Sequence, residues 1–122
     1  MIYSIVRYHV ERGQNTLIVV PTTSLVEQMY KDFADYGWDV GSYCHKIYAG
    51  KERETDSQVI ITTWQSIYKL PRKYFERFNV VVGDEAHQFK SKSLISIMSK
   101  LADAKYRFGF TGGLTGRLNL NS

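Results

Sequence analysis

The chain has 122 residues, of which 43% are hydrophobic and 23% charged, and its formal net charge is +4. This length allows at most one ordinary domain, and the hydrophobic content excludes the composition of disordered chains. Because no apolar run approaches about 20 residues and the start lacks a signal-peptide pattern, we predict a cytoplasmic protein with no membrane partner. The single cysteine, Cys44, excludes an internal disulfide and is interpreted as a half-buried free thiol.

The positive charge is concentrated in the second half of the chain. Residues 1–56 contain six basic and eight acidic side chains, whereas residues 57–122 contain ten basic and four acidic ones. Such an asymmetry is typical of a protein with an anionic partner, and a solvated basic surface gives the same pattern. The charge distribution alone does not distinguish an anionic partner from a solvated basic surface.

The chain is predicted to open inside a helix. The apolar residues Ile2, Ile5, Val6 and Val10 recur at helical spacing, and Gly13 is a stop signal. No capping residue or turn precedes this helix, so we expect that part of the natural sequence lies upstream.

A buried strand and a second helix follow. Residues 16–20, TLIVV, form a β-branched run that is typical of a strand covered on both faces. Ser24 and Glu27 fit a capping box, which predicts a helix from Ser24 to Tyr36 that Gly37 closes.

The rest of the chain alternates between short strands and helical segments. The predicted strands are 43–48, 58–62, 79–83 and 106–110, and the predicted helical segments are 64–70, 72–77 and 94–101. This alternation is typical of an α/β fold with a mostly parallel, doubly wound sheet. The sequence shows no repeat and no second domain.

Four polar clusters follow the predicted strands, where open parallel sheets bind their ligands. They are Pro21-Thr22-Thr23, residues 62–65, residues 84–87 and Thr111-Gly112-Gly113.

Asp84 and Glu85 follow an apolar strand directly. Carboxylates in such a place are costly unless they are hydrogen-bonded or face a cation, and Mg²⁺ binds carboxylate oxygen directly or through its retained waters. The neighbouring acid can orient or deprotonate an attacking water. Acids that merely cap a strand give the same pattern, so both explanations are open from these two residues alone.

Thr22, Thr23 and Ser24 bring hydroxyls and free amides to a helix start, an arrangement that binds phosphate. Capping of the helix by Ser24 would also account for polar residues at this position. Helix capping and phosphate binding can coexist.

Thr62, Thr63 and Gln65 repeat this pattern after the next strand. Trp64 between them has the ring to stack on a base, whereas a tryptophan at a helix start more often belongs to the core.

A basic run interleaved with aromatic residues comes next. Its cations are Lys69, Arg72, Lys73 and Arg77, and its aromatic residues are Tyr68, Tyr74 and Phe75. The run suits contact with a nucleic-acid backbone, and a solvated surface explains it equally well.

These motifs together resemble a known family. Asp84-Glu85-Ala86-His87 is the DEAH form of the Walker B motif, and over nearly the whole chain the motif order resembles the first RecA-like domain of superfamily-two helicases. PTTSLVEQ at 21–28 resembles motif Ia, ITTWQS at 61–66 a later nucleic-acid motif, and GFTGG at 109–113 motif III. The order is most similar to that of a phage recombination-repair helicase.

The resemblance implies a fold and an activity. The fold is a RecA-like, three-layer sandwich of the P-loop NTPase type. The activity is that of an ATP-dependent DNA helicase or translocase in recombination, repair or branched-DNA remodelling, in the cytoplasm of a bacterium or a phage-infected host.

The resemblance also assigns roles to residues. Asp84 would hold the Mg²⁺ of ATP through water, Glu85 would activate the hydrolytic water, and His87 would couple the nucleotide to Thr111 and Gly112. The nucleic-acid contacts, to DNA rather than RNA, would come from Pro21, Thr22, Thr23, Thr62, Thr63, Trp64 and Gln65.

The sequence departs from the family at one decisive place, because the phosphate loop G-x-x-x-x-G-K-[ST] is absent from the 122 residues. We therefore expect residues 1–122 to be a partial first domain that begins after motif I, without its N-terminal strand and phosphate loop, and ends just after motif III. Such a chain would not bind or hydrolyse ATP by itself. Its unpaired sheet edge predicts self-association or low stability.

Three other functions are compatible with the residues. One is a non-catalytic module that binds nucleic acid, and another is the motor part of a restriction-system translocase. The third, a small magnesium-dependent hydrolase built on Asp84, Glu85 and His87, is disfavoured because no further acids cluster with them.

Overall fold

A six-stranded sheet forms the centre of the computed structural model, which describes residues 2–48, 55–85, 88, 91–101, 106–110 and 117–119. The strands are β1 (Thr16–Val20), β2 (Cys44–Ile47), β3 (Val59–Thr63), β4 (Val80–Asp84), β5 (Tyr106–Phe110) and β6 (Arg117–Asn119). Their order in the sheet is β2-β3-β1-β4-β5-β6, and only β6, on β5, pairs antiparallel. This topology confirms the predicted α/β fold with a mostly parallel sheet.

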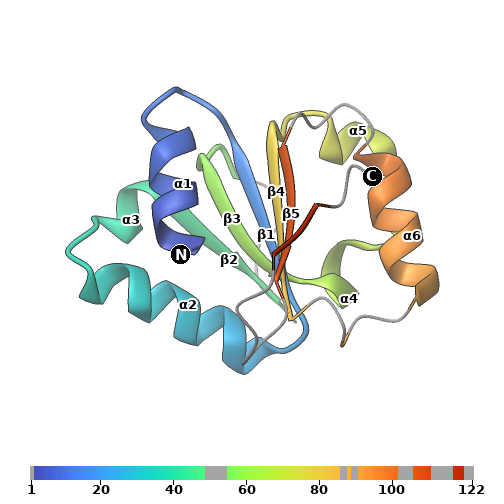
Figure 1. Ribbon diagram of the computed structural model, residues 1–122, viewed down its shortest axis with the longest axis horizontal. Helices are drawn as coiled ribbons and strands as arrows, with labels where there is room; N and C mark the ends of the chain where they lie inside the picture. The colour runs from blue at the N-terminus through green and yellow to red at the C-terminus, as the bar shows by residue number, and fades with distance from the viewer. Residues whose placement is uncertain are drawn as a thin grey trace.

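Helices cover both faces of the sheet (Figure 1). One layer contains α1 (Ile2–Val10), α2 (Thr23–Asp35) and α3 (Val40–Tyr43), and the other contains α4 (Trp64–Ile67), α5 (Arg72–Phe75) and α6 (Ser91–Lys100). The result is the three-layer sandwich that the alternation of elements predicted.

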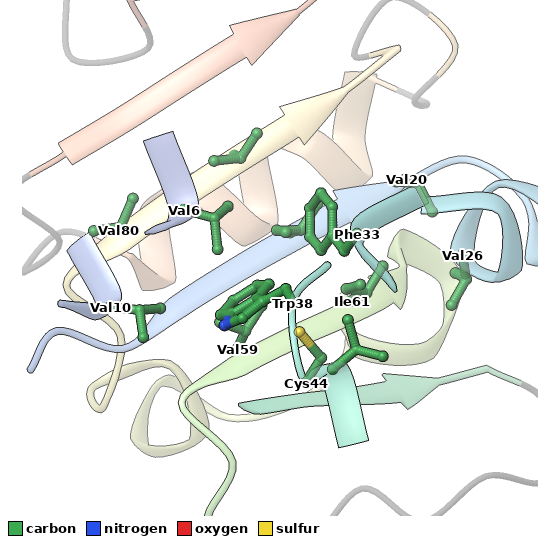
Figure 2. Close-up of a cluster of buried hydrophobic side chains, with 13 residues drawn as sticks. Val6, Val10, Val20, Val26, Phe33, Trp38, Cys44, Val59, Ile61 and Val80 are labelled. Atoms are coloured by element: carbon green, nitrogen blue, oxygen red, sulfur yellow. The ribbon is translucent and has the colours of Figure 1, made fainter. Parts of the chain in front are cut away.

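Two hydrophobic clusters hold the layers to the sheet. Along β1, Ile18 and Val20 belong to the cluster under α1 and α2, whereas Leu17 and Val19 belong to the cluster under α4 and α6. Side chains of a strand alternate between its two faces, so a strand that is apolar throughout needs a cover on each side. Figure 2 shows Val6 and Val10 of α1 and Phe33 of α2 in the first cluster.

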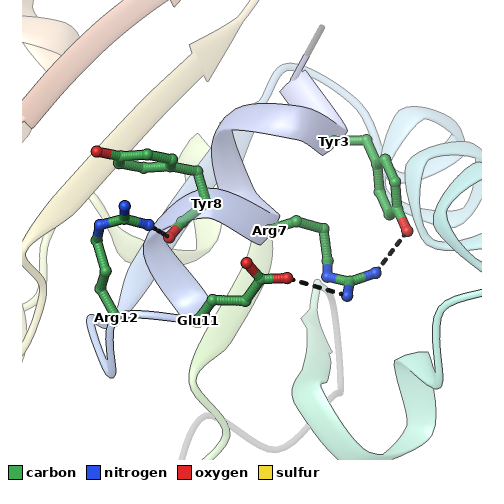
Figure 3. A network of polar contacts seen from close by, with 5 residues as sticks. All are labelled: Tyr3, Arg7, Tyr8, Glu11 and Arg12. Atoms are coloured by element: carbon green, nitrogen blue, oxygen red, sulfur yellow. Dashed lines mark hydrogen bonds and ion pairs between the residues drawn. The ribbon is translucent and has the colours of Figure 1, made fainter.

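Arg7 ties α1 to its neighbours (Figure 3). Its guanidinium donates to the hydroxyl of Tyr3 at 2.7 Å and forms an ion pair with Glu11 at 3.3 Å. It also lies 5.2 Å from the ring centre of Trp38, which follows α2. These contacts hold α1 against Trp38 and so against the segment that follows α2.

The start of α2 differs from the prediction. Thr22 is the N-cap residue, in an extended conformation, and its hydroxyl accepts a hydrogen bond from the Leu25 amide at 3.2 Å. The predicted capping box of Ser24 and Glu27 is therefore wrong, because the helix begins one residue earlier. Glu27 instead forms an ion pair with Lys46 of β2.

Other details also depart from the sequence analysis. The short helix α3 and the strand β6 were not predicted. Cys44 is 5% exposed rather than half-buried, and burial raises the pKa of its thiol to about 12. Within the described ranges, no helix has the length and apolar character that crossing a membrane requires.

Candidate functional site at the carboxyl edge of the sheet

The carboxyl ends of the central strands meet at one edge of the sheet. Val20 at the end of β1 is in register with Thr63 at the end of β3, and Val19 is in register with Gly83 of β4. The segments that follow these strands therefore start side by side, as the sequence analysis expected of parallel strands.

Asp84 is the last residue of β4, and Glu85 turns the chain off the sheet. Glu85 has a φ of 55°, in the left-handed region that costs a residue with a side chain about 1–2 kcal/mol. Its carbonyl accepts a hydrogen bond from the amide of Gln88 at 2.9 Å. Backbone strain of this kind concentrates at functional sites, where the surrounding structure maintains it.

The carboxyl group of Asp84 is half-buried, and its pKa is raised above the ordinary value. Burial is the main cause, and the adjacent negative charge of Glu85 adds to it. A hydrogen bond from the backbone of Glu85 acts in the opposite direction. A cation at this place would reduce the cost of ionising Asp84. The carboxylate of Asp84 is therefore a suitable ligand for a hard ion such as Mg²⁺.

A small hollow of about 100 Å³ lies between α2 and the end of β4. It is lined by Leu25, Gln28, Met29, Asp32 and Asp84. The sequence analysis gave no role to Gln28 or Asp32. Their i, i+4 spacing was the available signal, because it places both side chains on the same side of one helix.

The described residues contain no group of three histidine, cysteine or acidic side chains that could hold a metal ion together. A site with one or two carboxylates suits Mg²⁺, which commonly keeps several waters and binds substrate phosphates. His87, Thr111 and Gly112 lie outside the described residues.

The second part of the edge joins the start of α2 to the start of α4. Thr22, Thr23 and Ser24 are exposed, and the exposed Gln65 donates its side-chain amide to the carbonyl of the buried Pro21 at 3.3 Å. The structure therefore brings together two segments that are 44 positions apart in sequence.

The neighbouring threonines are oriented inward. Thr62 is 0% exposed and its hydroxyl donates to the carbonyl of Thr63 at 3.0 Å. Thr63 is 5% exposed and its hydroxyl is hydrogen-bonded to that of Ser66 at 2.8 Å. Both hydroxyls are hydrogen-bonded within the turn into α4, and both threonines are buried away from the solvent from which a phosphate would bind.

Trp64 is a core residue in this structure. It is 7% exposed and packs edge-on against Tyr68 at a ring distance of 5.7 Å. A base needs a free ring face to stack on, so the stacking role is corrected to the core role that was its alternative.

The comparison with known families decides the identity of the chain. Residues 1–115 match the family described as type III restriction enzyme, res subunit, or ResIII. The chain belongs to the ResIII family. The match covers the edge described above, from α1 to the segment after β5.

Relatives of this ResIII chain include a phage helicase. It is 36% identical over 120 residues to the ATP-dependent DNA helicase UvsW of enterobacteria phage T4, a match that covers 93% of this chain and 24% of the relative. Two crystal structures of T4 UvsW match with TM-scores of 0.82 each, at 35% and 34% identity. The matches cover 92% and 91% of this chain, and 42% and 24% of the solved chains. These results confirm the resemblance to a RecA-like helicase domain.

Proposed function

We propose that this ResIII chain is part of the motor of an ATP-dependent DNA helicase or translocase that acts in recombination, repair or branched-DNA remodelling. Residues 1–122 would be a first RecA-like domain that begins after motif I and ends just after motif III. The observation that carries the proposal is the strained Asp84–Glu85 turn at the end of a central strand, in a chain 36% identical to UvsW.

The two carboxylates take different roles in this proposal. ATP with Mg²⁺ supplies the phosphoryl group that is transferred to water and the charge that stabilises the transfer. The carboxylate of Asp84 would hold the ion through water, which offsets the cost of its burial. The carboxylate of Glu85 would accept a proton from the attacking water, and His87 would couple this event to Thr111 and Gly112.

The nucleic acid would lie along the start of α2. Its exposed Thr22, Thr23 and Ser24 stand at the positive end of a helix of 13 residues, which favours a backbone phosphate. Pro21 places this helix start, and Gln65 is tied to its carbonyl. Because these contacts involve the backbone, the preference for DNA over RNA rests on the relationship to UvsW.

Catalysis is tested by Glu85→Gln in the full natural polypeptide. We expect ATP hydrolysis to fall by about 10²–10⁴-fold while nucleotide binding is retained, because a general base is lost and the shape of the side chain is kept. Asp56→Asn is the control, since Asp56 is exposed and lies before β3. An unchanged rate of hydrolysis for Glu85→Gln would refute the catalytic role. Residues 1–122 alone are expected to show no hydrolysis.

Two alternatives remain distinguishable by experiment. DNA binding without hydrolysis by the full natural polypeptide would favour a non-catalytic nucleic-acid-binding module. The family match favours a restriction-system motor as the other alternative, and DNA translocation coupled to cleavage would identify it.

A further inference from the structure

The two helix layers differ in charge. Helices α1, α2 and α3 carry two basic and three acidic side chains, whereas α4, α5 and α6 carry four basic and no acidic ones. The charge asymmetry along the sequence has therefore become an asymmetry between the two faces of the sheet, which lie on opposite sides in Figure 1.

The cations on the helices of the first layer are paired with acids, and those on the helices of the second form no ion pair with any described residue. Three ion pairs are found within the described ranges, all on α1, α2 and β2: Arg7–Glu11, Lys31–Asp35 and Lys46–Glu27. Lys69, Arg72 and Lys73 are exposed and form no ion pair with any described residue. We call these three residues the α4–α5 basic patch.

Two other basic residues of this layer form hydrogen bonds to backbone carbonyls that stabilise the fold. The guanidinium of Arg77 donates to the carbonyls of Thr55 and Ser57, which fixes the segment before β3. The ammonium of Lys100 donates to the carbonyl of Tyr68 at 2.7 Å. The basic run of the sequence analysis therefore divides into one structural residue, Arg77, and the three residues of the patch.

The α4–α5 basic patch continues the candidate nucleic-acid site. Gln65 lies in α4 and Lys69 lies two residues beyond its end, and both side chains are exposed. Pro71 then leads into Arg72 and Lys73, in the first turn of α5. In Figure 1 the start of α2 and α4 lie at one end of the sheet and α5 lies at the other, so these polar and basic groups lead from the carboxyl edge along the helix-covered face of the sheet to α5.

The patch is built on a fixed support. The carbonyl of Tyr68, next to Lys69, accepts hydrogen bonds from the hydroxyl of Ser96 at 3.2 Å and from the ammonium of Lys100. Ile67 and Phe75, on either side of the patch in sequence, are 0% and 1% exposed. The backbone that carries the cations is therefore held in place before a ligand arrives, which lowers the cost of binding.

The surroundings of the patch favour a polyanion over a protein partner. Protein interfaces contain a buried apolar centre with aromatic anchors. Of the large exposed apolar side chains of the described residues, Tyr8, Tyr36 and Tyr43 belong to the other layer, and Ile95 on α6 is a single aliphatic side chain without an aromatic anchor beside it in that group.

We infer that the α4–α5 basic patch is a second contact for the nucleic-acid backbone, which extends the path of the strand from the carboxyl edge of the sheet onto α5. This inference rests on the proposed nucleic-acid binding at α2 and Gln65. The ligand class is a phosphodiester backbone, read by charge and without base recognition.

The test measures binding of single-stranded DNA by fluorescence anisotropy over a range of salt concentrations. The variant Lys69→Gln/Arg72→Gln is compared with Lys31→Gln/Arg12→Gln, which removes the same residue types from exposed positions of the first layer. Each lost phosphate contact lowers the slope of log K against log salt by about 0.7 for single strands. We expect the slope to fall by about 1.4 in the patch variant and to stay unchanged in the control.

The length of the oligonucleotide provides a second readout. Short oligonucleotides that only reach α2 and Gln65 should bind the patch variant as well as the wild type, and longer ones should bind it more weakly. Equal slopes for the two variants at every length would overturn the inference and leave the proposed function intact. Failure of the wild-type chain to bind any DNA would overturn both. Thermal melts of each variant establish that it is folded.

Discussion

At the scale of single residues, Asp84 is the position where the proposed function and stability conflict. Its pKa is raised, first by burial and then by the charge of Glu85. A raised pKa means that the folded state binds the proton more tightly than the unfolded chain does. The stability of the folded state therefore falls as the pH rises from the ordinary value of 3.8 through the raised pKa, and the full cost is present above that pKa.

We expect Asp84→Asn to stabilise the fold at pH 7. The amide keeps an oxygen that can accept the backbone hydrogen bond and removes the buried charge. A gain of about 1 kcal/mol would raise the Tm by roughly 3–6 °C for a chain of this size, and the gain should shrink toward pH 3. Thermal melts at both pH values measure this, with Asp56→Asn as the control for loss of one exposed charge. A lower Tm than wild type at pH 7 would contradict the account.

At the scale of elements, the start of α2 has a structural role beside the binding role that we propose for it. The hydroxyl of Thr22 caps the helix by accepting from the Leu25 amide, whereas Thr23 and Ser24 are exposed within the first turn. Capping and the proposed phosphate binding therefore involve different neighbouring residues, and substitutions can separate them.

Thr22→Ala is expected to lower the free energy of unfolding by about 1 kcal/mol, because the Leu25 amide loses its acceptor. Ser24→Ala should change it by only a few tenths of a kcal/mol, since alanine is favourable inside a helix. Urea unfolding of both variants measures the difference, and Thr22→Ser should restore most of the cap. A larger loss for Ser24→Ala than for Thr22→Ala would place the cap where the sequence analysis first put it.

At the scale of the whole molecule, the edges of the sheet are the places where association with another chain is expected. The sequence analysis expected an unpaired edge and self-association. The structure pairs β5 on its outer side with β6, through the partners Phe108 and Asn119, Gly109 and Leu118, and Phe110 and Arg117. This short antiparallel strand covers backbone groups that would otherwise recruit another chain.

Deletion of residues 117–122 should therefore increase self-association, because it exposes the outer edge of β5. Light scattering at increasing protein concentration measures the change. Deletion of residues 120–122 alone is the control, since it leaves β6 in place. An equal mass for both deletions at every concentration would mean that this edge does not govern association.

Much of the fold follows from local sequence patterns. The apolar run at 16–20 appears as β1 with the predicted bounds, and the run before Asp84 appears as β4. Gly13 and Gly37 end their helices with φ angles of 73° and 95°, which side chains disfavour. These features depend on short-range patterns of burial and backbone freedom, so the sequence is sufficient to predict them.

Sequence alone determined the α/β alternation, the carboxylates at a strand end and the helicase resemblance, because each is a pattern of neighbouring residues. Only the tertiary structure decided which polar groups are available to a ligand. In the structure Thr62 and Trp64 are buried, and Lys69 is exposed to solvent. Arg77 is hydrogen-bonded to the segment before β3. Availability depends on contacts between segments far apart in the chain, such as Gln65 with Pro21, which local patterns do not contain.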